Sequence, residues 1–299
     1  MYSQIDSNKR KTMLLIAIFI AVVMLAGWAF SFYSKSGYGG LIFAAILSTG
    51  MSLFGFYQGD KIALWTAGAQ PISKEQNPYV YRMVENLCIT SGLSVPKIYV
   101  MPDSAINAFA TGRDPEHASI AVTRGAIEKL ENEELEGVLA HELSHIKNYD
   151  IRLMMIVIVL VGILALLSDW FIRIRFFGRG SGRDSNSKSG GQIGAILLVV
   201  GIILLILSPI IGKLIQFAIS RKREYLADAS GSLLTRYPEG LARALEKIKM
   251  ENKPLDHANN ATAHLYISNP FGGAKHFASA LFSTHPPIDD RIAELRKMA

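Results

Sequence analysis

Two histidines and a glutamate stand at metal-binding spacing in the segment His141-Glu142-Leu143-Ser144-His145. The residues before this segment are helix formers with several acids at their start, so the sequence predicts a helix here. On a helix, residues four apart share a face, and His141 and His145 can therefore hold one metal ion. Glu142 borders that face and can reach a water on the metal without being a ligand. The pattern is that of the zincin hydrolases, although five residues can also match it by chance.

A third protein ligand has to come from elsewhere in the chain. One zincin class uses a histidine six residues after the second one, with a glycine between; Asn148 and Ile151 stand at those places and exclude this class. A second class uses a glutamate on a later helix, with an aspartate one turn further on. Glu224 and Asp228 fit this class as the third ligand and as the acceptor of a hydrogen bond from a ligating histidine. An ordinary solvated helix can carry the same pair.

Three protein ligands leave one coordination position for water, which is typical of catalytic zinc sites. The predicted chemistry is peptide hydrolysis, in which Glu142 takes the proton of the attacking water and passes it to the leaving nitrogen. Two imidazoles and one carboxylate favour Zn²⁺, one per chain, with manganese, cobalt or iron as alternatives. A second hypothesis is a membrane scaffold with a structural metal, which His264 or His285 would support as a fourth ligand.

Apolar residues are concentrated in four runs. Half of the 299 residues are hydrophobic, and the runs cover residues 13–32, 41–57, 153–167 and 193–211. Runs of about 20 apolar residues are long enough to cross a bilayer as helices, and the third run needs to continue to about Ile172. The net charge is +6, but the basic residues cluster beside the apolar runs. This distribution predicts contact with a lipid bilayer and no nucleic-acid partner.

The third run begins just after His145 and the fourth ends just before Glu224. If both are helices joined through the flexible segment 178–191, they form a hairpin that brings the two ligands to the same membrane face. A re-entrant hairpin is an alternative. The distribution of flanking basic residues favours a cytoplasmic metal site. We expect the hairpin to matter more to the metal site than the first span, residues 1–33.

These features predict an integral membrane α-helical protein with a mainly helical zincin-like (gluzincin) catalytic domain that carries a small β-sheet. Residues 1–58 are the expected two-helix membrane anchor, and residues 59–150 the catalytic part with the sheet and the metal helix. Residues 151–217 are the expected transmembrane or re-entrant hairpin. Residues 218–299 are the expected catalytic part with the third ligand and the C-terminal helices.

Smaller elements are also predicted in the catalytic parts. Short strands are expected at residues 97–101, 107–112 and 119–122, with turn signals between them. An exposed edge of this sheet could bind an extended substrate as an added strand. Helices are expected at residues 238–249 and 289–298.

The chain resembles the HtpX family of bacterial membrane zinc endopeptidases, relatives of the CAAX prenyl-protein peptidases. The resemblance covers nearly the whole chain. It rests on the order of the apolar runs and on the segments GVLAHELSHIKNYDIRLM, REYLADASG, VPKIYVM, INAFATG and FSTHPPIDDRI. It implies quality-control proteolysis of damaged or misassembled membrane proteins. It also implies a multi-pass protein of the bacterial cell membrane with its catalytic site facing the cytoplasm.

The resemblance also implies roles for single residues. The residues implied as metal ligands and general base are His141, His145, Glu224 and Glu142. Asn107 matches a position near the substrate backbone. His285 and Arg291 match a C-terminal pair that faces the active site, and His285 would stabilise the oxyanion. A prenyl-protein-type peptidase, with the same chemistry on lipidated C-termini, is an alternative, although four apolar runs are few for its larger chamber. The sequence carries no indication of an oligomeric state.

Overall fold

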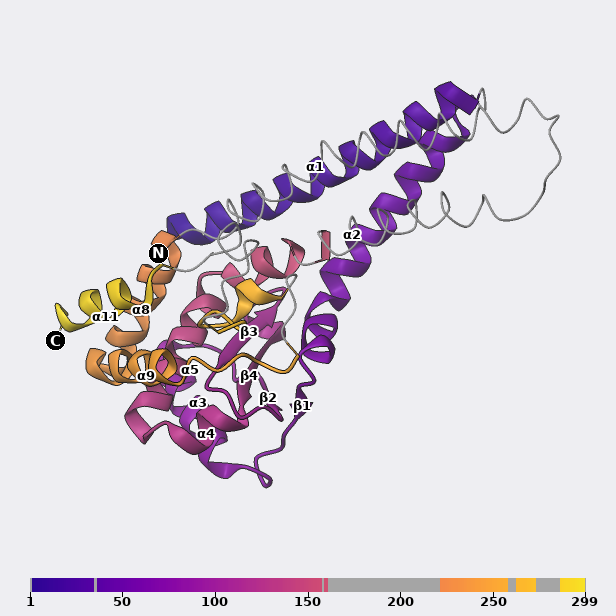
Figure 1. Cartoon of the computed structure of the whole chain (residues 1–299). Helices are drawn as coiled ribbons and strands as arrows, with labels where there is room; N and C mark the ends of the chain where they lie inside the picture. The colour runs from indigo at the N-terminus through magenta and orange to yellow at the C-terminus, as the bar shows by residue number, and fades with distance from the viewer. Residues whose placement is uncertain are drawn as a thin grey trace.

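In the computed structural model of the chain, two long helices form an arm that projects from a compact part, in which helices cover a small sheet (Figure 1). The mainly helical fold with a small sheet, which the sequence predicts, is confirmed. The predicted segment 178–191, the fourth apolar run, most of the third run and His285 lie outside the described residues. The structure describes residues 2–34, 37–157, 159–160, 221–257, 262–272 and 286–298.

The arm consists of α1 (Tyr2–Ser34) and α2 (Gly39–Thr66), which run antiparallel to each other. α2 extends beyond position 58, at which the sequence places the end of the anchor. The side chains that α2 buries are mostly small and recur every three or four residues, which lets neighbouring helices approach closely. These buried residues are Ala44, Ser48, Ser52, Gly55, Gly59, Ala63 and Leu64.

Two glycines of α2 contact the helical residues that follow the metal helix. A Cβ atom added at Gly55 would lie 2.3 Å from Val159 Cγ1, and one added at Gly59 would lie 2.8 Å from Met155 Cγ. Several large apolar side chains of α2, such as Phe54, are exposed, whereas Met51 and Phe56 pack against the cluster that contains Met155 and Val159. Among the described residues, α2 is the one helix that is long and apolar enough to cross a membrane.

The sheet has four strands in the order β1 (Gln70–Pro71), β2 (Lys97–Met101), β4 (Ala118–Thr123) and β3 (Ala108–Gly112). The three predicted strands are observed within one residue of their expected ends. β4 pairs in parallel with β2 and antiparallel with β3, so the last strand in sequence lies inside the sheet. The sequence did not predict β1 or the parallel pair.

β3 is an edge strand, but its edge is not exposed. All five of its residues are buried, and the carbonyl oxygen of Ala108 accepts a hydrogen bond of 3.0 Å from the Ile267 N–H. α5 (Asn132–Lys147) packs against the same strand. Residue 267 thus occupies part of the β3 edge, whereas both residues of β1, at the other edge of the sheet, are exposed.

The helices of the compact part enclose a large apolar core against one face of the sheet, while Phe109 and Ala121 on the other face belong to a second apolar cluster. Buried members of the large core include Ile98 and Ile120 from the sheet, Leu139 from α5 and Leu245 from α9. The two predicted C-terminal helices are observed as α9 and α11. Besides α5, the α-helices described in the compact part are α3 (Pro78–Ser91), α4 (Arg124–Lys129), α8 (Arg221–Thr235), α9 (Pro238–Glu251) and α11 (Ile288–Arg296).

Candidate metal centre

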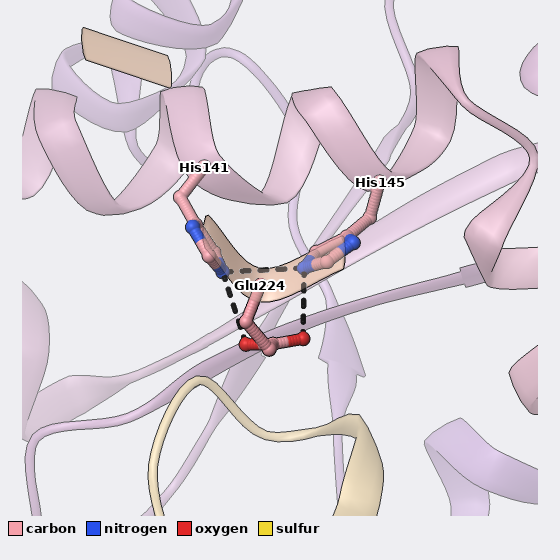
Figure 2. A group of neighbouring side chains, drawn as sticks. All are labelled: His141, His145 and Glu224. Carbon is pink, nitrogen blue, oxygen red and sulfur yellow. Dashed lines mark hydrogen bonds and ion pairs between the residues drawn. The ribbon is translucent and has the colours of Figure 1, made fainter. Parts of the chain in front are cut away.

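α5 carries the two histidines and is held firmly at its N-terminus. Glu134 accepts a hydrogen bond of 2.8 Å from the Glu131 N–H, which satisfies a backbone donor of the first turn. The Glu134 carboxylate also lies 2.7 Å from Lys247 Nζ and ties α5 to α9. Because α5 is regular through the motif, His141 and His145 project from the same face, as Figure 2 shows.

α8 carries Glu224 and lies directly against α5. A Cβ atom added at Gly231 would lie 3.0 Å from the backbone nitrogen of His141, so only a glycine allows this approach without displacing a neighbour. Glu224, Asp228 and Gly231 are spaced by four and then three residues and therefore share one face of α8. The face that carries the acidic residues is thus the face that contacts the metal helix.

His141, His145 and Glu224 form a buried group whose ligand atoms all lie within 4.8 Å of one another. The two Nε2 atoms face each other at 3.2 Å, and the Glu224 carboxylate oxygens lie 3.9 Å and 3.7 Å from them. Two nitrogens on one tetrahedral zinc ion stand about 3.3 Å apart. The donor set and its spacing therefore fit a divalent metal, with the three side chains converging on one point (Figure 2).

The outer nitrogen of His141 lies 2.9 Å from Asp228 Oδ1. Asp228 in turn receives two hydrogen bonds from Arg291, at 2.8 Å and 2.6 Å. Burial opposes the negative charge of Asp228, but Arg291 and His141 outweigh it and hold the pKa of this carboxyl below its usual value. A carboxylate on Nδ1 keeps the proton there and leaves Nε2 as an electron-pair donor for a metal.

The outer nitrogen of His145 also faces a carboxylate, that of Asp150, which the sequence did not predict. His145 Nδ1 lies 3.1 Å from Asp150 Oδ2, and both side chains are buried. α5 ends at Lys147, and Tyr149 adopts the left-handed conformation, with φ of 60°, before a helix resumes at Asp150. This turn brings Asp150 back to the His145 ring. An acidic residue just past the motif was a signal, but the turn was not predictable from residue types.

Glu142 lies beside the two histidines in a closed environment. Burial and the nearby Glu224 charge raise its pKa to about 7, although His145 and Arg291 oppose this shift. Its carboxylate accepts a hydrogen bond from the Ala110 N–H of β3. The oxygen Oε1 has no hydrogen-bond partner within the described part of the chain. An acceptor in this state can take a proton from a water molecule.

The remaining predicted residues lie at different places. Asn107 is buried beside β3, and its Nδ2 makes two long contacts, of 3.4 Å and 3.5 Å, with Ser268. Arg291 is buried behind the metal group, where its Nη1 also donates to the Ile267 carbonyl oxygen at 2.9 Å. His264 Nε2 lies 3.4 Å from the Met154 carbonyl oxygen and does not belong to the described ligand group. His285 is outside the described residues.

Comparisons with known proteins agree with this chemistry. A protein named Protease HtpX homolog from Caldanaerobacter subterraneus subsp. tengcongensis is 44% identical over 298 residues, which cover 100% of this chain and 98% of that protein. Its namesake in Listeria monocytogenes serotype 4a is 42% identical over 304 residues, with both chains covered fully. The crystal structure of S. mikatae Ste24p is similar in fold, with a TM-score of 0.53 and 17% identity, covering 99% of this chain and 67% of that one.

The model of peptidase family M48 matches residues 74–299, which include the whole described ligand group. Metal dependence and peptide hydrolysis follow from this family and from the protease relatives. The chain belongs to peptidase family M48 and is a metalloprotease that hydrolyses peptide bonds.

Proposed function

We propose that the chain is a membrane-bound zinc endopeptidase in which His141, His145 and Glu224 hold one Zn²⁺. The observation that carries the proposal is the convergence of three buried ligand side chains from α5 and α8 beside Glu142. Two imidazoles and one carboxylate are the ligand set of several catalytic zinc proteases. When bound, zinc supplies a Lewis acid that acidifies water and polarises the scissile carbonyl.

Glu142 acts as the general base and then as the general acid. With a pKa of about 7, it can accept the proton of the attacking water near neutral pH and return it to the leaving amine. Asp228 and Asp150 keep the ligating rings in the required tautomer and orientation. Arg291 acts on the metal group through Asp228, and its Nη1 also lies 3.8 Å from the Glu224 carboxylate. His285, which the family resemblance implies near the oxyanion, remains part of the proposal.

Asn107 is the proposed contact to the substrate backbone. Its Nδ2 contacts with Ser268 are at the long limit for a hydrogen bond, and a peptide carbonyl can replace them. The Ala110 N–H and the Ala108 carbonyl point to the same side of β3, towards Glu142 and residue 267. A substrate strand along β3 would therefore have to displace the hydrogen bond from the Ile267 N–H to Ala108.

The proposed substrates are membrane proteins that are damaged or misassembled. α1 and α2 carry the two N-terminal apolar runs and expose large apolar side chains along the arm, among them Leu25, Trp28, Phe43, Ile46, Leu53 and Phe54. Such side chains are stable in contact with lipid. The proposal places the arm across the bacterial cell membrane and the metal group at its cytoplasmic face, where it can reach membrane proteins.

Reconstitution of the metal-free protein tests the core of this proposal. The full chain is purified in detergent with a chelator, and hydrolysis of an unfolded protein substrate is followed while Zn²⁺ is added. We expect activity to return at about one Zn²⁺ per chain. Activity in the chelated protein that added zinc does not increase would overturn the metal assignment. A saturating stoichiometry of two or more would overturn the single site.

A further inference from the structure

The first turns of α1 contact the metal centre from behind. Asn8 is only 1% exposed, and its Nδ2 donates to Asp150 Oδ1 at 2.7 Å and to the Asn148 carbonyl oxygen at 2.9 Å. Its Oδ1 accepts a hydrogen bond of 3.2 Å from Arg223 Nη1. One side chain of α1 therefore joins the end of α5 to the start of α8, the two helices that carry the ligands.

Asp150 connects this contact to a ligand. One of its carboxylate oxygens accepts from Asn8, and the other lies 3.1 Å from His145 Nδ1. Asn8, Asp150 and His145 thus form a continuous buried chain of hydrogen bonds. An outer carboxylate sets the direction in which a histidine presents Nε2 to its metal. A group that fixes the carboxylate fixes this direction as well.

The chemistry of the partners allows one orientation of the Asn8 amide. Its two N–H groups face a carboxylate and a carbonyl, which only accept, and its oxygen faces a guanidinium, which only donates. A flipped amide would put its oxygen against two acceptors. All of these groups are buried, so water cannot replace a lost bond without cost.

A neighbouring residue of α1 contacts the same turn. Lys9 Nζ lies 4.5 Å from the centre of the Tyr149 ring, and the Arg152 guanidinium lies 4.9 Å from it. Tyr149 is the residue in the left-handed conformation, which is unfavourable for a side chain of its size. Two consecutive residues of α1 therefore support the turn that brings Asp150 to His145.

We propose that Asn8 is a positioning residue of the metal centre, acting on His145 through Asp150, so that α1 is part of the catalytic structure. This inference rests on the metal centre proposed above. It adds a direct structural role to the first span, residues 1–33, which the sequence analysis expects to matter less to the metal site than the hairpin. The apolar part of α1 lies further along the helix. The turns that would anchor α1 in a membrane therefore differ from the turn that contacts the metal centre.

The test measures Zn²⁺ affinity of the full chain in detergent, by competition with a chromophoric chelator. Asn8→Asp keeps the shape but puts an acceptor against Asp150 and Asn148. We expect zinc binding to weaken about ten- to hundredfold, the range of outer-shell partners. In the exchange Asn8→Asp with Asp150→Asn, the new amide at position 150 can again bridge position 8 and His145. We expect it to bind zinc several-fold more tightly than Asn8→Asp alone.

Thr12→Val is the matched control, because Thr12 is buried on the same helix and its hydroxyl donates within the helix, to the Asn8 carbonyl oxygen. It should bind zinc like the unchanged chain. Equal losses of zinc affinity in Thr12→Val and Asn8→Asp would overturn the inference. So would a double variant, Asn8→Asp with Asp150→Asn, whose loss of affinity is the sum of the two single losses. If Asn8→Asp does not fold, Asn8→Ser, which keeps one donor, takes its place, and zinc affinity equal to that of Thr12→Val would then overturn the inference.

Glu224→Ala is measured in parallel and separates the two proposals. Loss of zinc in Glu224→Ala together with unchanged affinity in Asn8→Asp overturns the Asn8 inference and leaves the ligand set intact. Retained zinc in Glu224→Ala together with a loss in Asn8→Asp overturns the ligand set and supports the link from Asn8 to His145.

Discussion

The two histidines of α5 are oriented by different parts of the chain. Asp228, held by Arg291, faces His141, and Asp150, held by Asn8 and Arg223, faces His145. Both carboxylates lie on the nitrogen that points away from the proposed metal. A metal site built in this way depends on buried charges that are not ligands, and substitutions there should change metal affinity as well as activity.

Glu142→Gln should separate metal binding from catalysis. The amide cannot accept the proton of the attacking water, so hydrolysis should fall by about 10²- to 10⁴-fold. His141, His145 and Glu224 are unchanged, and zinc content should stay near one per chain. Metal analysis and a peptidase assay on the same sample check this. Simultaneous loss of zinc would mean that Glu142 is a ligand.

Removal of the proposed third ligand, Glu224, should reduce zinc affinity more than removal of the nearby Asp228. Asp228→Ala leaves the ligand set complete and should weaken zinc binding about ten- to hundredfold. Glu224→Ala removes one of the three proposed ligands, so it should weaken zinc binding further and abolish hydrolysis. Chelator competition measures both. A zinc-replete, active Glu224→Ala protein would contradict the assignment.

Metal affinity should depend on pH through His145. Burial lowers the pKa of His145, but its hydrogen bond to Asp150 and the charges of Glu224 and Asp150 outweigh burial and raise this pKa to about 9 in the metal-free protein. Below that pH the metal must displace a proton, so affinity should fall about tenfold per pH unit. Burial lowers the pKa of His141, so protons compete less with the metal for this ring.

The check is a zinc titration of the chelated protein from about pH 7 to about pH 10. Affinity should rise with pH and level off above about 9. Asp150→Asn removes a charge that favours the protonated ring, so its curve should level off at a lower pH. A flat dependence over the whole range would contradict the raised pKa of His145.

At the scale of elements, the contact between α5 and α8 decides whether the ligands meet. Gly231→Val would place side-chain atoms against the His141 backbone, where even one Cβ lies at 3.0 Å. Overpacking of this kind costs about 1–3 kcal/mol, and α8 would have to move, carrying Glu224 away from the histidines. Zinc affinity and the metal-dependent rise in Tm should both decrease.

Leu233→Ala provides the control for this prediction. Leu233 lies on the same helix two residues further on, but its side chain is 79% exposed. Its truncation should leave zinc affinity unchanged. If Gly231→Val and Leu233→Ala behave alike, the close approach of the two helices does not set the ligand geometry.

At the scale of the whole molecule, the arm of α1 and α2 reverses the usual pattern of a soluble helix pair. The residues that α2 buries are mostly small, and many large apolar residues of both helices are exposed, where a bilayer would surround them. The turn at the far end of the arm and the compact part should then lie on opposite sides of the membrane.

Cysteine labelling of intact cells can test this topology. The native Cys88 is buried, and burial raises the pKa of its thiol to about 11, so its background reactivity should be low. Tyr38, in the turn between α1 and α2, and Ile89, on α3, are both exposed. Tyr38→Cys should react with an impermeant maleimide from outside, and Ile89→Cys only after the cells are permeabilised. The opposite result would place the metal group outside the cytoplasm.

Several parts of the fold and the site followed from local sequence. The spacing of His141 and His145 depends only on the helical period, and the Glu224–Asp228 pair follows the same period on α8. The three short strands and the two C-terminal helices also followed from local residue patterns. The order of the strands did not, because the pairing of β4 between β2 and β3 is decided by the packing of the whole sheet.

The support behind the ligands was decided by the tertiary structure. Asp150 reaches His145 because Tyr149 adopts a conformation that its residue type disfavours and that packing with α1 stabilises. Asn8 precedes an apolar run and carries no local signal, yet it contacts Asp150 across 142 positions. Local periodicity determines which side chains share a face of one helix. Only the assembled core determines which buried polar groups, far apart in sequence, must satisfy one another.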